Sequence, residues 1–125
     1  MKRNPDLERA ILIAMEANDG TRTPDLSQVD ADETEIHYHI TLLNEAGLIV
    51  AVDVKSLDNQ FAMIPIRLTI RGHEYLEDIR DVEIWRRTKA GANAVSNFSL
   101  ATLKALAKGF TKEKIRQHTG VEIDM

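Results

Sequence analysis

The 125-residue sequence contains no cysteine and no long apolar run. The absence of cysteine excludes disulfides, thiolate ligands for zinc and cysteine nucleophiles. No apolar stretch approaches the roughly 20 residues that a membrane-spanning helix needs, and the opening residues do not form a signal peptide. Hydrophobic residues make up 43% of the chain, which is enough for a core. We therefore expect a soluble, cytoplasmic protein that does not enter a membrane.

Charge is distributed unevenly along the chain, whose net charge is −4. Through Asp78 there are 7 Lys and Arg against 15 Asp and Glu, and from Ile79 onward there are 9 against 5. An acidic body followed by a basic tail favours either head-to-tail self-association or a nucleic-acid contact through the tail. Two solvated faces without a partner explain the same pattern equally well.

Two helices and a loop are predicted before residue 48. Asn4-Pro5-Asp6 is typical of a helix start, because Asn caps the first turn and Pro fits the first helical position. Residues 21–30 form a loop that holds a short strand or one helical turn. Asp32 caps the next helix, with Glu35 reaching back to the cap, and Gly47 ends it in the left-handed conformation. The buried stripe of this helix consists of Ile36, Ile40 and Leu43.

A β-hairpin is predicted next. Strands 48–54 and 61–68 flank a polar turn at 56–60. Pro65 has no backbone donor, so it belongs on the free edge of the hairpin or at a bulge.

The remaining residues are predicted to be helical. Thr69 caps a helix over roughly 70–90, which is followed by a break at 91–97. Ser99 begins another helix, Gly109 interrupts it, and a last short helix follows.

Helix, loop, helix, hairpin and helix in this order predict an α+β fold of the winged-helix type. We expect the winged-helix domain to span residues 1–80. Residues 81–125 would form a C-terminal helical extension that docks on the body or mediates dimerisation.

Three segments resemble known families. The second helix and the following strand resemble the reading helix and first wing strand of bacterial winged-helix regulators, at Ile36, His39, Ile40, Leu43, Gly47, Leu48 and Ile49. Over most of the chain, the sequence is similar to a family of short bacterial and prophage proteins catalogued as domain of unknown function 2513, through Met1-Lys2-Arg3 with Leu7, Tyr38-His39, the run 65–76, Arg80 and Trp85. Residues 106–121 resemble the first two helices of a helix-turn-helix from response-regulator output domains.

The winged-helix resemblance implies contact with double-stranded DNA, with the second helix in the major groove. The candidate residues for base contacts are Thr34, His37, Tyr38, Thr41 and Asn44. Lys55 and Arg67 are the candidate phosphate contacts on the wing. Further cations available to phosphates are Arg86, Arg87, Lys89, Lys112, Lys114 and Arg116. Together with the prophage family, these residues predict a homodimeric regulator of phage or mobile-element origin.

Acidic residues around the same helix leave a second interpretation open. Asp30, Asp32, Glu33 and Glu35 would repel phosphates. The alternative is a winged-helix adaptor that binds a host or phage protein through this acidic face. The acids are not read as a catalytic pair, because helix-dipole stabilisation explains carboxylates at a helix start.

No metal, cofactor or catalytic site is predicted, and the chain is not expected to be an enzyme. His37 and His39 point about 200° apart on a helix, so they do not share an ion. His39 is predicted to pack beside the core, and His73 to hydrogen-bond between wing and helix. Trp85 is either a core anchor or a dimer-interface anchor.

Overall fold

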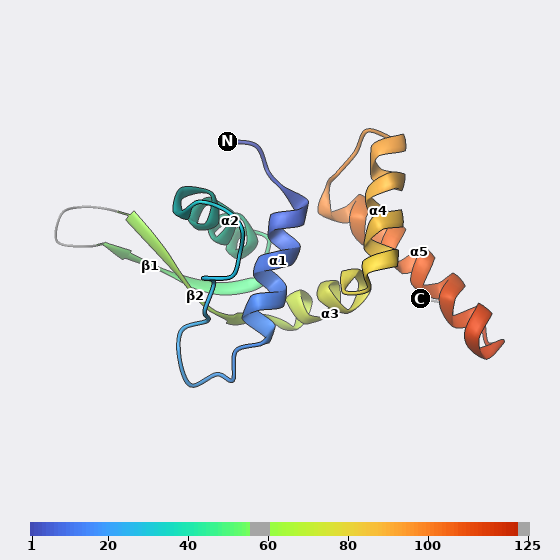
Figure 1. Ribbon diagram of the computed structural model, residues 1–125, viewed down its shortest axis with the longest axis horizontal. Helices are drawn as coiled ribbons and strands as arrows, with labels where there is room; N and C mark the ends of the chain where they lie inside the picture. Colours follow the sequence, from blue (N-terminus) through green and yellow to red (C-terminus); the bar gives the residue numbers. More distant parts are fainter. Residues whose placement is uncertain (56–60, 123–125) are drawn as a thin grey trace. The chain divides into compact units, whose positions relative to one another are not determined.

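A computed structural model describes residues 1–55 and 61–122, which form an α+β structure with five helices and a two-stranded antiparallel hairpin (Figure 1). In chain order the elements are α1 (Pro5–Glu16), α2 (Glu33–Glu45), β1 (Ile49–Lys55), β2 (Phe61–Leu68), α3 (Ile70–Ile79), α4 (Val82–Ala94) and α5 (Leu100–Thr119). The order is compatible with a winged-helix-like topology. The predicted turn at 56–60 lies outside the described residues. The chain divides into two compact units, Met1–Leu76 and Glu77–Met125.

The predicted start of α1 is confirmed. The Asn4 side chain accepts hydrogen bonds from the backbone N–H groups of Asp6 at 3.1 Å and Leu7 at 3.3 Å, and Pro5 takes the first helical position. The apolar face of α1 is buried against α2 and β2 and consists of Leu7, Ile11, Leu12 and Met15.

The segment between α1 and α2 contains neither the short strand nor the helical turn that the sequence predicts. Instead, the Val29 N–H bonds the Leu26 carbonyl at 3.0 Å and closes a turn. Just before it, the Asp25 carboxylate accepts the Ser27 N–H at 2.9 Å. Such local side-chain bonds offer the backbone an alternative to a helix or strand, which is why polar loops of this composition stay irregular.

Both predicted ends of α2 are confirmed. The Asp32 carboxylate accepts the Glu35 N–H at 2.8 Å, and Gly47 has a φ of +76°. Ile40 and Leu43 are buried as expected, whereas Ile36 is only half-buried.

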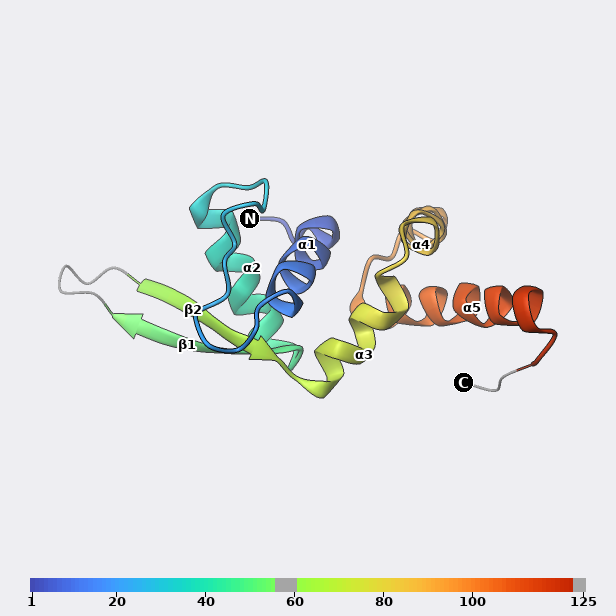
Figure 2. The ribbon, with the colours of Figure 1, turned by 60° about the horizontal axis from the view of Figure 1, so that its bottom comes forward.

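The hairpin has a bulge beside Pro65, as predicted. Val50 pairs with Arg67 but Ala51 pairs with Pro65, so Ile66 is the extra residue. Strand β2 has the predicted bounds, and β1 begins one residue later than predicted. One face is buried through Ile49, Met63, Pro65 and Leu68. Helices α1 and α2 pack on the hairpin (Figures 1 and 2).

The predicted continuous helix over 70–90 is wrong, because it breaks between α3 and α4. Thr69 caps α3 as expected, since its hydroxyl accepts the Gly72 N–H at 3.0 Å. The break follows from Asp81, whose carboxylate accepts the Ile84 N–H at 2.9 Å and starts a new helix. An aspartate that bonds the backbone three residues ahead favours a helix start over a helix interior.

The predicted break at 91–97 is displaced, because α4 continues through Gly91 to Ala94. A Cβ on Gly91 would lie 3.2 Å from both δ-carbons of Leu106, so the glycine lets α5 pack closely on α4 (Figure 2). The connection between the two helices is instead 95–99, and Ser99 caps α5 as predicted by accepting the Thr102 N–H at 3.1 Å.

The predicted interruption at Gly109 is also wrong. Helix α5 runs unbroken from Leu100 to Thr119 and ends at Gly120, which has a φ of +72°. One glycine inside a helix costs only about 1 kcal/mol, which burial of neighbours such as Leu103 and Ala107 offsets. Residues 106–119 are therefore part of one helix and not the two helices of a helix-turn-helix.

Candidate functional site

The solvent-facing side of α2 is the first candidate site. At 100° per residue, Thr34, Tyr38, Thr41 and Glu45 fall within about 60° of one another on one side of this helix. Thr34 is exposed, Tyr38 is 37% exposed and Thr41 is half-buried. We call these three residues, which carry hydroxyl groups, the α2 hydroxyl face.

His39 anchors the opposite side of α2. Its side chain is 1% exposed, its Nε2 accepts the Asn4 N–H at 2.8 Å and its Nδ1 lies 2.8 Å from the Glu35 carbonyl oxygen. Because Nε2 accepts, Nδ1 carries the hydrogen and donates to Glu35. The prediction that His39 packs in the core is confirmed. Its ring also meets the Tyr38 ring edge-on at 5.6 Å between centroids, which helps to orient Tyr38.

The other α2 candidates are partly engaged within the fold. His37 is half-buried. The Thr41 hydroxyl donates to the His37 carbonyl at 3.0 Å. The Asn44 side-chain oxygen accepts the Ala51 N–H at 3.0 Å, which ties α2 to β1. Asn44 therefore has a structural role that the sequence did not indicate.

The two wing candidates lie on the hairpin. Arg67 is exposed, and its Nη1 donates to the Leu68 carbonyl at 3.1 Å. The Lys55 backbone ends β1 opposite Phe61, but its side chain lies outside the described residues. His73, predicted to link wing and helix, is exposed on α3, and its ring makes no hydrogen bond to the described residues.

Negative charge surrounds the start of α2. Asp30, Asp32 and Glu33 are exposed there. In the preceding loop, hydrogen bonds from Thr21 lower the pKa of Asp19, and hydrogen bonds from Ser27 lower that of Asp25, so both stay ionised. Over residues 1–76 there are 7 Lys and Arg against 13 Asp and Glu.

An apolar groove of about 420 Å³ lies beside α2, between the loop and β2. Its apolar lining includes Pro24, Leu26, Val29, Ile36, Met63 and Pro65. Sequence reasoning missed it because three separate segments form it. The available signal was the set of apolar residues in an otherwise polar loop at 21–31.

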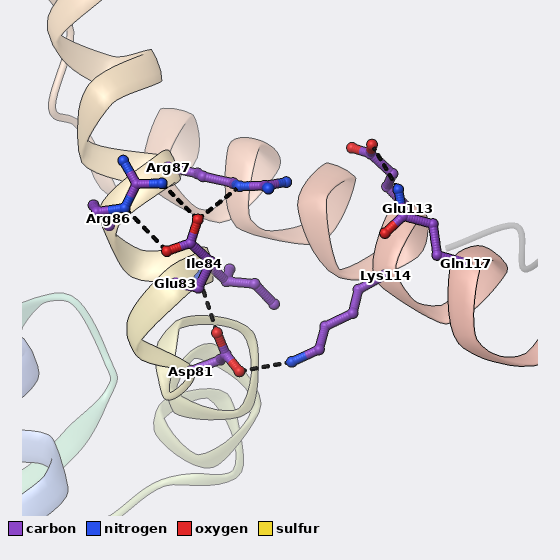
Figure 3. Close-up of polar contacts among 8 residues, drawn as sticks. All are labelled: Asp81, Glu83, Ile84, Arg86, Arg87, Glu113, Lys114 and Gln117. Atoms are coloured by element: carbon purple, nitrogen blue, oxygen red, sulfur yellow. Dashed lines mark hydrogen bonds and ion pairs between the residues drawn. The ribbon is translucent and has the colours of Figure 1, made fainter.

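The unit Glu77–Met125 has its own cluster of charges (Figure 3). Glu83 bonds both Arg86 and Arg87, and Arg86 is the larger cause of a Glu83 pKa of about 2. Asp81 accepts a hydrogen bond from Lys114 of α5 at 2.7 Å, which also lowers its pKa. This pairing across two helices was not visible in the sequence.

Trp85 is 4% exposed, so it is a core residue, and the Lys89 ammonium lies 5.9 Å from the centre of its ring. Residues 1–55 and 61–122 contain no group of three His, Asp or Glu arranged to hold a metal ion. Within the same ranges, every helix is too short or too polar to cross a membrane.

Comparison with known proteins identifies the family to which this chain is similar. A family model described as "Hypothetical protein (DUF2513)" matches residues 2–99, which confirms the predicted resemblance. An "Uncharacterized protein" of Haemophilus influenzae is 38% identical over 112 residues, covering 86% of this chain and 93% of the relative. No solved structure matches the chain. The family match stops immediately before α5.

Proposed function

We propose that this chain, which belongs to the family described as Hypothetical protein (DUF2513), is a winged-helix regulator that binds double-stranded DNA through α2. The main support for this proposal is the α2 hydroxyl face. It is a polar row on a helix capped at Asp32, ended at Gly47 and fixed from behind by His39.

Such a helix suits the major groove. The groove admits an α-helix, and hydroxyl groups donate to or accept from base edges. Thr34 and Tyr38 are the outermost groups of the row and so are the first to reach a base. The hairpin would serve as the wing, with Arg67 on a phosphate. We propose that two copies bind two half-sites, as dimeric helix-turn-helix proteins do.

The test begins by selecting bound duplexes from a random-sequence pool. Affinity for the selected duplex is then measured by fluorescence anisotropy for the wild type and for Thr34→Val/Tyr38→Phe, which removes two hydroxyl groups and little volume. At about 1 kcal/mol for each lost hydrogen bond, the variant should bind roughly tenfold or more weakly. Thr21→Val, which removes an exposed hydroxyl of the same unit, is the control. Equal binding by all three proteins would refute the assignment of α2.

A second candidate is supported by the apolar groove. Its apolar walls lie next to the exposed acids of α2, which suits a protein segment with apolar side chains and basic flanks. A photo-crosslinker at Val29, inside the groove, is compared with one at Val52, which is exposed on the hairpin. A discrete adduct from Val29 alone, lost in Leu26→Asp, supports this function. Equal labelling from both positions contradicts it.

A further inference from the structure

Eight of the nine cations of the unit Glu77–Met125 fall into two groups, and the ninth, Lys89, lies 5.9 Å from the centre of the Trp85 ring. One group is paired with carboxylates of the same unit, as Figure 3 shows for three of its members. These pairs are Arg80–Glu77, Arg86–Glu83, Arg87–Glu83, Lys108–Asp78 and Lys114–Asp81. Arg86, Arg87 and Lys114, which the sequence predicts as phosphate contacts, are therefore each ion-paired within the unit, with Arg86 and Arg87 sharing the Glu83 carboxylate.

The second group lies along α5. Lys104, Lys112 and Arg116 make no ion pair with a carboxylate of the described residues, and Lys112 and Arg116 are exposed. Together with Lys108 they repeat every four residues, so successive side chains rise by about 6 Å and drift by about 40° around the helix. We call these four residues the α5 basic row.

The neighbouring acids leave the α5 basic row positive. Glu113 lies three residues before Arg116 and lines the same hollow as Lys112 and Arg116, and its carboxylate accepts a hydrogen bond from Gln117 at 3.4 Å. Glu122 lines the same shallow hollow as Lys112 and Arg116. Lys108 is paired with Asp78 at 3.2 Å, so within the described residues the members of the row that make no ion pair are Lys104, Lys112 and Arg116.

We propose that the α5 basic row is a second nucleic-acid contact, which binds the phosphates of duplex DNA without reading sequence. It shares its ligand with the proposed function but is a separate surface. Its charge complements a phosphate backbone, and evenly spaced cations suit a repeating anion. Protein interfaces and membrane-bound helices need exposed apolar side chains as anchors. No large hydrophobic side chain of α5 is exposed. The row therefore fits a polyanion better than a protein or a lipid surface.

The size of the effect follows from counterion release. Each cation that contacts a phosphate of duplex DNA adds about 0.9 to the slope of log affinity against log salt. Removing Lys112 and Arg116 should lower that slope by about 2 and weaken binding by on the order of tenfold near physiological salt.

The experiment measures anisotropy of a labelled random-sequence duplex across a series of salt concentrations. Lys112→Gln/Arg116→Gln is compared with Arg86→Gln/Lys114→Gln, which changes net charge equally but removes cations that are paired internally. Far-UV circular dichroism checks that both variants are folded. We expect the slope to fall by about 2 in the first variant and by less than 1 in the second.

Equal slopes for the two variants would overturn the proposal, because they would reflect net charge alone. Failure of the wild type to bind the random duplex at low salt would also overturn it. Neither result depends on α2, whose test uses the selected duplex and the hydroxyl variant. A wild type that binds with the expected salt slope but shows no sequence preference would count against α2 and not against the row.

Discussion

Gly72 offers the sharpest test of how the unit Met1–Leu76 is packed. It lies in the first turn of α3, against the Leu48 carbonyl, which also accepts the Thr69 N–H at 3.0 Å. A Cβ built on Gly72 would lie 1.9 Å from the Leu48 oxygen and 3.0 Å from the Leu48 carbonyl carbon. Both atoms belong to backbone, so no side-chain rotation relieves the clash.

The expected cost of Gly72→Ala follows from this geometry. Moving the backbone apart costs about 1–3 kcal/mol as overpacking, and weakening the Leu48–Thr69 hydrogen bond adds about 1 kcal/mol. Alanine returns about 1 kcal/mol through its greater helix propensity. We therefore expect a net loss of about 2 kcal/mol in the free energy of unfolding.

Two other helical glycines serve as controls, because their surroundings differ. Gly109 has nothing within 4 Å of a Cβ, so Gly109→Ala should gain about 1 kcal/mol. Gly91→Ala should fall between the two, since it meets only the flexible end of Leu106. Urea unfolding followed by circular dichroism measures all three variants, and fluorescence of Trp85, the sole tryptophan, reports on the second unit. A Gly72→Ala protein as stable as the wild type would refute the packing argument.

Three further predictions concern single side chains. His39→Phe removes the acceptor of the Asn4 N–H, so it should lower the free energy of unfolding by about 1–3 kcal/mol, measured by thermal unfolding. An unchanged melting temperature would contradict this hydrogen bond. Asp81→Ala should lower the free energy of unfolding by about 1 kcal/mol, because it removes the cap of α4. Asp81→Ser keeps a capping side chain and loses only the contact with Lys114, so it should lower the free energy of unfolding less. Equal losses of stability in the two variants would argue against capping. The pKa of Glu83 is lowered from 4.5 to about 2, so its contribution to stability should be complete above pH 4.5 and be lost as the pH falls toward 2. An NMR titration of the Glu83 carboxylate measures this pKa, and a midpoint near 4.5 would disprove the arginine contacts.

Helix starts that depend on one capping residue were predictable from sequence. Asn4, Asp32, Thr69 and Ser99 all cap as expected, because a short polar side chain serves the first turn from within its own segment. Asp81 was missed although it is the same kind of signal, since the apolar spacing on either side of it is consistent with one long helix.

Glycine was the less reliable signal. At Gly47 and Gly120 it ends a helix, whereas at Gly91 and Gly109 it lies within one. The difference at Gly91 is the close approach of Leu106, a contact between helices that local propensity does not contain.

Only those features of the candidate site that depend on a single helix were predictable from the sequence. The exposure of Thr34 and Tyr38 follows from helical periodicity. The hydrogen bond from Ala51 to Asn44 and the pairing of Lys114 with Asp81 each join separate segments and could not be predicted from the sequence. The apolar groove also joins separate segments, and its one signal in the sequence was the apolar residues of the loop at 21–31. For the same reason, the sequence could not show which basic residues of the second unit are ion-paired.

The measurement that tests the central claim most directly is NMR mapping of the backbone amides while the selected duplex is added to isotope-labelled protein. If α2 reads DNA, the largest shift changes will fall on α2 from Thr34 to Thr41, with smaller changes around Arg67. Changes confined to the apolar groove or to α5, with α2 unaffected, would contradict the claim that α2 is the reading helix.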